Sequence, residues 1–172
     1  MRDVAKAEDA CAQYEKTGRI DWITDLAEIR AKYGVKNVYP DVGQLFAQST
    51  MAEPRVAAAM IAQLIKGMGA GHVCRGTDAI WIGSPQWQIE ALQRLEVPED
   101  IQRKHGYAPL GAADDPVKNA IFGENSARLY NVKPQLRADV KTDQLSRYKV
   151  LYALHGAGRT NLAYGSVRKD AG

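Results

Sequence analysis

The chain is poor in cysteine and histidine, and it has no long hydrophobic run. Its two cysteines, Cys11 and Cys74, are too few for a disulfide framework or a thiolate metal site. No apolar run approaches the roughly 18 residues that a membrane span needs. The N-terminus also lacks the hydrophobic region of a signal peptide. These absences favour a cytoplasmic protein without a membrane partner.

A strong excess of one charge is also missing. The net charge of the 172 residues is +3, and the basic residues form no cluster that stands alone on one stretch. Nucleic acid is therefore not expected as a partner. A hydrophobic content of 45% and a charged content of 25% are typical of a soluble globular protein. The length fits one compact domain or one part of a larger one.

Helical patterns occupy much of the chain. A helix is predicted over 25–33, with Thr24 as N-cap, Glu28 as its capping-box partner and Gly34 as the terminating glycine. An amphipathic pattern after a proline predicts a longer helix over 55–68. Further helices are predicted over 3–15, 86–95, 99–106, 117–130 and within 139–158.

Two stretches, 36–43 and 72–78, have the composition of short strands, and a polar loop around Ser49 and Thr50 follows the first. The order helix, strand, helix, strand predicts an α/β protein with a parallel sheet. Two strands cannot form a sheet with its own core, and a complete α/β barrel needs at least about 200 residues. The chain is therefore expected to be part of a larger structure.

The second predicted strand ends in Gly-Thr-Asp, where the backbone would hold Asp78 rigidly at the open edge of the fold. The sequence 76-GTDAIWIGSPQWQIEALQRLEVPEDIQRKHGYAPLG-111, followed by 121-IFGENSARLYNV-132, resembles the C-terminal part of the amidohydrolase-related (amidohydrolase 2) family. These are metal-dependent hydrolases built on a (β/α)₈ barrel, and they are similar to the aminocarboxymuconate-semialdehyde decarboxylase group. The resemblance extends from about residue 20 to residue 168.

The resemblance implies that residues 1–132 form a partial barrel with strands seven and eight, and that 133–172 form a helical C-terminal extension. Asp78 would contact a catalytic divalent metal, zinc before others, and accept a proton from the water that the metal activates. Trp81, in the loop that follows, is a candidate substrate-binding residue. The substrate would be a small molecule, cleaved at a C–N or C–O bond or, in the decarboxylase branch, at a carboxylate.

The His-x-His pair of the family is absent from this sequence. The three histidines, His72, His105 and His155, are expected to be solvated or capping side chains. Asp78 is then the only family ligand, and one carboxylate does not make a tight transition-metal site. Two interpretations stay open. The chain is a C-terminal fragment of a hydrolase that a missing N-terminal half of the barrel completes, or it is a non-catalytic remnant that binds a partner or has no activity. The isolated chain would hold no metal in either case, and residues 84–112 are a candidate homo-oligomer interface.

Arg75 departs from the family, which usually has an aromatic residue inside its last strand. Burial of an unpaired guanidinium would cost several kcal/mol. The sequence leaves three outcomes open: Arg75 pairs with a carboxylate, it extends to solvent, or its strand is not fully covered.

Overall fold

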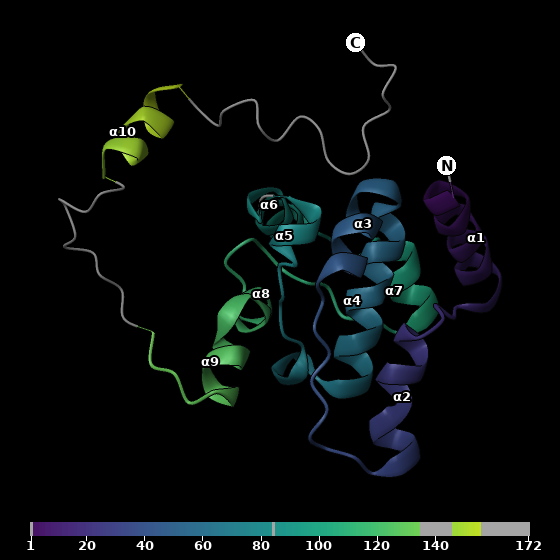
Figure 1. Cartoon of the computed structure of the whole chain (residues 1–172). Coiled ribbons are helices and arrows are strands. Elements are labelled where there is room, and N and C mark those ends of the chain that lie inside the picture. The colour runs from purple at the N-terminus through teal and green to yellow at the C-terminus, as the bar shows by residue number, and fades with distance from the viewer. Residues whose placement is uncertain (1, 84, 135–145, 156–172) are drawn as a thin grey trace.

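The computed structural model describes residues 2–83, 85–134 and 146–155. Over these residues the chain is helical, with 67% helix, 2% strand and neither sheet nor barrel (Figure 1). The prediction of an α/β fold is therefore wrong: the described chain does not form the last two strands of a (β/α)₈ barrel with a helical extension. The helices pack directly on one another around a central helix, and no sheet separates them.

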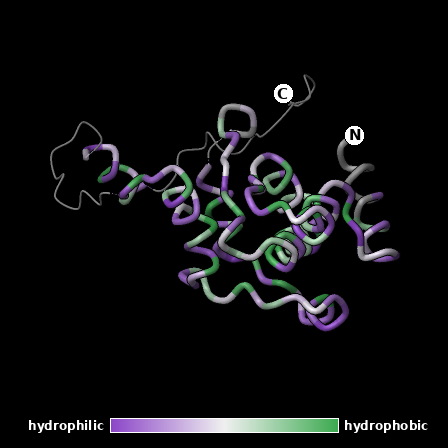
Figure 2. The backbone as a smooth tube through the Cα atoms, turned by 90° about the horizontal axis from the view of Figure 1, so that it is seen from below, coloured by the Kyte–Doolittle hydropathy of each residue, from purple (hydrophilic) through white to green (hydrophobic). Residues whose placement is uncertain are grey.

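The central helix is α4 (Pro54–Met68), which begins with a proline at its first turn. Every residue from 56 to 64 is buried, so the helix is covered nearly all round. Its alanines let neighbouring helices approach closely. Helix α2 (Ile23–Tyr33) lies so near that a Cβ added at Gly67 would be 2.7 Å from the carbonyl carbon of Ala27. Helix α3 (Gln44–Ala52) packs on another side of α4 and buries Phe46 completely. In Figure 2 the hydrophobic stretches gather where these helices meet.

The other elements surround this group or follow it in the chain. They are α1 (Arg2–Thr17), the 3₁₀ turn η1 (Ala70–His72), α5 (Ala79–Ile82), α6 (Gln86–Arg94), α7 (Glu99–His105), α8 (Pro116–Asn119), the π-helical turn η2 (Ala120–Glu124), α9 (Asn125–Leu129) and α10 (Ser146–His155). The predicted helices are thus confirmed apart from their exact ends, and the parts of 139–158 beyond α10 lie outside the described residues. Of the described helices, none combines the length and the apolar character that a bilayer crossing requires.

Two local predictions around α2 and α3 are wrong. Helix α2 begins two residues earlier than expected, and Thr24 is not its N-cap. The Thr24 hydroxyl instead accepts from the Ile20 N–H at 2.9 Å and donates to Gln63 Oε1 at 2.8 Å. The expected polar loop around Ser49 and Thr50 belongs to α3, because both hydroxyls donate to carbonyls one helical turn earlier and so remain satisfied inside a helix.

The two predicted strands are extended, but they meet at a single isolated parallel bridge between Asp41 and Cys74. The Val42 N–H donates to the Cys74 carbonyl at 3.0 Å, and the Cys74 N–H donates to the Pro40 carbonyl at 2.9 Å. Pairing cannot continue because α3 starts directly after Gly43, while Asp78 turns into a left-handed conformation (φ 45°) and starts α5. The chain therefore has two parallel extended segments side by side (Figure 1), where a sheet was expected.

Candidate functional site

Asp41 and Asp78 share an open pocket of about 540 Å³. Each acid lies near the end of one extended segment, and the two segments run parallel. The acids therefore meet at the same end of the pair. The other residues that line the pocket are Gly43, Gln44, Leu45 and Gln48.

Each acid lies over a glycine of the opposite segment. A Cβ added at Gly76 would lie 2.5 and 2.6 Å from the two carboxylate oxygens of Asp41. A Cβ added at Gly43 would lie 3.0 Å from Cγ of Asp78 and would overlap Oδ2 of the same carboxylate. The bridge pairs Asp41 with Cys74, so Gly76 lies two residues beyond the partner of Asp41 and the contact between the acid and this glycine is diagonal. A side chain at either glycine would displace the acid that faces it.

The Asp78 side chain is exposed, and the start of α3 holds it in place. Its Oδ2 accepts a hydrogen bond from the Gln44 N–H at 2.6 Å. The first N–H groups of a helix lack partners within the helix, and the positive end of the helix dipole favours a carboxylate there. Behind Asp78, the Thr77 carbonyl accepts from Gln88 Nε2 at 2.9 Å. One oxygen of Asp78 is thus committed to the helix, which leaves Oδ1 for a ligand.

The other predicted site residue and the histidines lie elsewhere. Trp81 is on α5, is 79% exposed and does not line the acid pocket. His72 stacks on Tyr39 with ring centroids 4.9 Å apart, whereas His105 ends α7 and His155 ends the exposed α10. None of these three imidazoles lines the pocket. The structure therefore brings Asp78 together with Asp41, and with neither Trp81 nor a histidine.

Arg75 is half-buried beside α6 and η2. One of its terminal nitrogens donates to the Pro85 carbonyl at 3.4 Å, and the guanidinium lies 5.7 Å from the centroid of the Phe122 ring. Its buried Nε makes no hydrogen bond with the described residues. Burial lowers the pKa of Arg75, and Asp41 partly opposes this effect. Arg75 forms no ion pair within the described part of the chain. Of the three outcomes left open, the structure therefore supports the third, in which the segment that contains Arg75 is not fully covered.

Asp41 is the site residue that sequence analysis missed. A signal was present, because both predicted strands have an aspartate near their carboxyl end. Neighbouring parallel strands place their carboxyl ends at one edge, which is where ligands of α/β proteins bind. Two acids in such positions meet when their segments are neighbours, and the bridge between Asp41 and Cys74 makes the segments neighbours.

The donor set is too small for a metal centre. Across the described ranges, no three His, Cys, Asp or Glu side chains gather where they could hold a metal ion. A catalytic zinc ion needs three protein ligands with an open fourth position. The two carboxylates of the pocket do not meet this requirement, so the residues present do not fit the divalent metal that the sequence resemblance implies. On their own, Asp41 and Asp78 can accept protons and hydrogen bonds.

Known proteins offer no relative: no protein family, no curated protein and no solved structure matches this chain. The geometry of the acid pocket and the motifs of the sequence are therefore the features that indicate a function.

Proposed function

We propose that this chain supplies the carboxylate that acts as general base in a metal-dependent hydrolase of the amidohydrolase-related type, and that it is not a complete enzyme by itself. The observation that carries the proposal is the crossed arrangement of Asp41 over Gly76 and Asp78 over Gly43. This arrangement leaves two carboxylates facing a pocket at one end of two parallel segments. It agrees with a role for the Gly-Thr-Asp motif in holding an acid toward solvent.

In the proposed reaction Asp78 is the proton acceptor. A positioned carboxylate within hydrogen-bond reach of an attacking water accelerates the attack by taking its proton. The hydrogen bond from the Gln44 N–H fixes the orientation of the Asp78 carboxylate and leaves Oδ1 for this task. Asp41 faces the same pocket and can accept a hydrogen bond from the water or from a donor group of the substrate.

The pocket favours hydrolysis over decarboxylation. Its volume of about 540 Å³ is within the range of pockets for small ligands, about 300 to 1,000 Å³. Two carboxylates line the pocket, and no cationic side chain does. They would repel a carboxylate substrate at short distance, whereas a neutral amide or ester would not meet this repulsion. The preferred substrate class is therefore a small molecule with a C–N or C–O bond.

A second polypeptide would complete the enzyme. The metal requires ligands that the described part of this chain does not gather, and zinc sites of hydrolases commonly use imidazole nitrogens. We therefore propose a partner that contributes histidines and meets this chain at the acid pocket.

The test compares this chain alone with its complex with a histidine-bearing polypeptide encoded next to it, both co-expressed. We expect zinc and amide or ester hydrolysis only in the complex. Asp78→Asn should lower kcat at least about a hundredfold, as for the loss of a general base, while the complex still forms. Asp114→Asn, at an exposed acid that does not line the pocket, is the matched control. Stoichiometric zinc in the chain alone, or full activity of the Asp78→Asn complex, would contradict the proposal.

A second candidate function is that of a non-catalytic interaction fragment. It is favoured by large apolar side chains that lie in solvent, among them Trp22 at 85%, Trp81 at 79% and Met51 at 62% exposure. Large apolar side chains in solvent mark a partner surface where they form one contiguous patch. A complex that forms without zinc or hydrolysis, and whose affinity falls when Trp81 is replaced by alanine but not when Asp78 is replaced by asparagine, would favour this function.

A further inference from the structure

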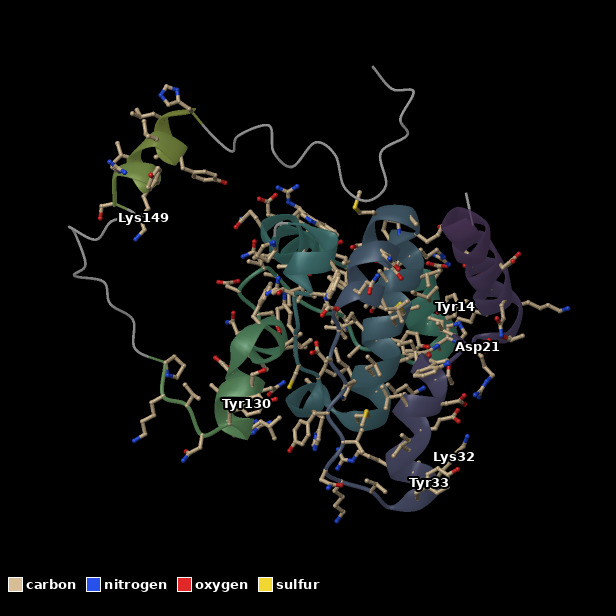
Figure 3. The ribbon with its side chains drawn as sticks, viewed as in Figure 1. Tyr14, Asp21, Lys32, Tyr33, Tyr130 and Lys149 are labelled. Atoms are coloured by element: carbon tan, nitrogen blue, oxygen red, sulfur yellow. The ribbon has the colours of Figure 1, made fainter. Side chains whose placement is uncertain are left out.

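The imidazole of His105 is partly buried where α1, α4 and α7 meet. Its ring centroid lies 5.4 Å from that of Tyr14 on α1 and 5.4 Å from that of Tyr107. The backbone of Gly18, directly after α1, closes a third side, because a Cβ there would be 2.8 Å from Cε1 of the imidazole. Figure 3 shows Tyr14 on the inner side of α1, beside α7. The ring thus takes part directly in the contact between α1 and the rest of the fold.

The charged groups around His105 are mostly positive. Lys66 of α4 donates through Nζ to the His105 carbonyl at 2.6 Å, and Lys104 of α7 donates to the Glu15 carbonyl at 3.1 Å. Glu15 of α1 is the one carboxylate that influences the imidazole, and Arg55 already binds it at 2.8 Å. Tyr14 and Tyr107 are the other titratable groups in contact with the ring. Neither ring nitrogen forms a hydrogen bond with a described residue that would stabilise a proton there.

We propose that His105 makes the docking of α1 depend on pH, so that protonation of the imidazole releases α1 from the surface formed by α4 and α7. A charged ring would stay partly desolvated between two tyrosines and near two ammonium groups. Release of α1 removes Tyr14 and Gly18 from the ring and lets more water solvate it. Desolvation of a charge without a partner is costly, so solvation favours the released state.

The effect has a definite direction. Burial lowers the pKa of His105 from its ordinary value of 6.5, with Lys104 and Lys66 next in effect, and Glu15 opposes them. The docked state therefore binds fewer protons than the released state between the lowered pKa and about 6.5. Docking keeps its full stability above about pH 6.5, and it weakens as the pH falls through this window. The loss of docking stability is complete below the lowered pKa of His105.

Helix α1 is the element that can detach from the rest of the fold. It contributes Tyr14, which is 1% exposed, and the partly buried Cys11 to the core, whereas its described neighbours Ala12, Gln13, Glu15 and Lys16 are exposed. In contrast, α4 is buried over 56–64 by contacts with α2 and α3 that do not involve the imidazole. Loss of α1 therefore leaves the central packing of α2, α3 and α4 in place.

Docking of α1 is measured by hydrogen exchange of the full chain. Mass spectrometry reads the exchange on a peptide that covers residues 9–17, and the rates are corrected for the intrinsic rate at each pH. In the wild type we expect exchange of this peptide to rise between pH 7.5 and 5.5, by about tenfold for each unit by which docking lowers the His105 pKa. Peptides of α4 should keep their protection over the same range. His105→Gln should make exchange of residues 9–17 independent of pH, whereas His72→Gln should behave as the wild type.

Unchanged protection of residues 9–17 between pH 7.5 and 5.5 in the wild type would overturn the proposal. So would an equal pH dependence in His105→Gln. If that variant does not fold, the titration of His105 followed by NMR in the wild type decides instead. A pKa at or above 6.5 overturns the proposal, and a lower pKa together with the pH-dependent exchange supports it.

Discussion

The Asp78 carboxylate accepts a hydrogen bond from the Gln44 N–H at 2.6 Å, and this bond joins the end of one extended segment to the first turn of α3. Gly43, which comes just before that turn, offers no side chain to do so. Asp78 therefore acts as the cap of a helix that is 34 residues away in the sequence. The proposed general base also has a structural role, and experiments on it must measure stability and activity separately.

Replacement of Asp78 measures the structural role. Asp78→Ala should lower the free energy of unfolding by about 1 to 2 kcal/mol, because α3 loses its capping acceptor and the left-handed backbone at φ 45° suits alanine poorly. Asp78→Asn should cost less, since asparagine tolerates that backbone and still offers an oxygen. Urea unfolding gives both values. Asp114→Ala, at an exposed position, is the control, and an Asp78→Ala variant as stable as the wild type would refute the capping role.

A methyl group at Gly43 tests the close approach of the two segments. The Cβ of an alanine at this position would overlap the Asp78 carboxylate. We expect Gly43→Ala to destabilise the protein by about 1 to 3 kcal/mol, as overpacked sites do. The double variant with Asp78→Ala should lose less than the sum of the two single variants. Gly123→Ala, where the added Cβ meets nothing within 4 Å, is the control, and strict additivity would contradict the contact.

The helices were predictable because their signals are local. Pro54 starts α4, Gly34 ends α2 in a left-handed conformation, and Asp115 accepts from the Val117 N–H at 2.8 Å at the start of α8. Each signal acts within about one turn of its helix. The sheet was predicted wrongly because a strand depends on partners elsewhere in the chain. Residues 36–43 and 72–78 have strand-like composition, yet within the described part of the chain they pair with each other at a single bridge.

The site was predictable in part. The place of Asp78 at the end of an extended segment follows from the sequence, but its bond to Gln44 and its opposition to Asp41 depend on tertiary packing. Trp81 was a candidate because it follows the motif, and the short helix α5 directs it away from the pocket. The helices within 84–112, a candidate oligomer interface, bury Leu92 and Ile101 in the core of the chain itself. The oligomer interface stays a prediction.

Asn125 tests the link between α9 and the turn before the second extended segment. It is 1% exposed, and its Nδ2 donates to the Ala70 carbonyl at 2.7 Å and to the Val73 carbonyl at 2.8 Å. Asn125→Ala leaves two carbonyls without this donor, so the free energy of unfolding should fall by about 2 to 4 kcal/mol, from roughly 1 to 3 kcal/mol for each unsatisfied group with some relief from water. Asn119→Ala, at an exposed position, should cost much less. Equal urea midpoints of the two variants would show that Asn125 does not hold the turn.

The buried hydroxyl of Tyr14 should make the free energy of unfolding depend on pH in the alkaline range. Burial, with Tyr107 next in effect, raises the pKa of the Tyr14 hydroxyl above its ordinary value of 10.0. The unfolded chain loses this proton near pH 10 while the folded chain keeps it. The contribution to stability is therefore complete below about pH 10 and is lost as the pH rises further, at about 1.4 kcal/mol per pH unit for one such tyrosine. Urea unfolding between pH 9 and 11.5 should show this decline, and Tyr14→Phe should reduce its slope by that amount. Tyr33→Phe, at a position 74% exposed, should leave the slope unchanged, and an equal slope in Tyr14→Phe and the wild type would show that Tyr14 is not the group responsible.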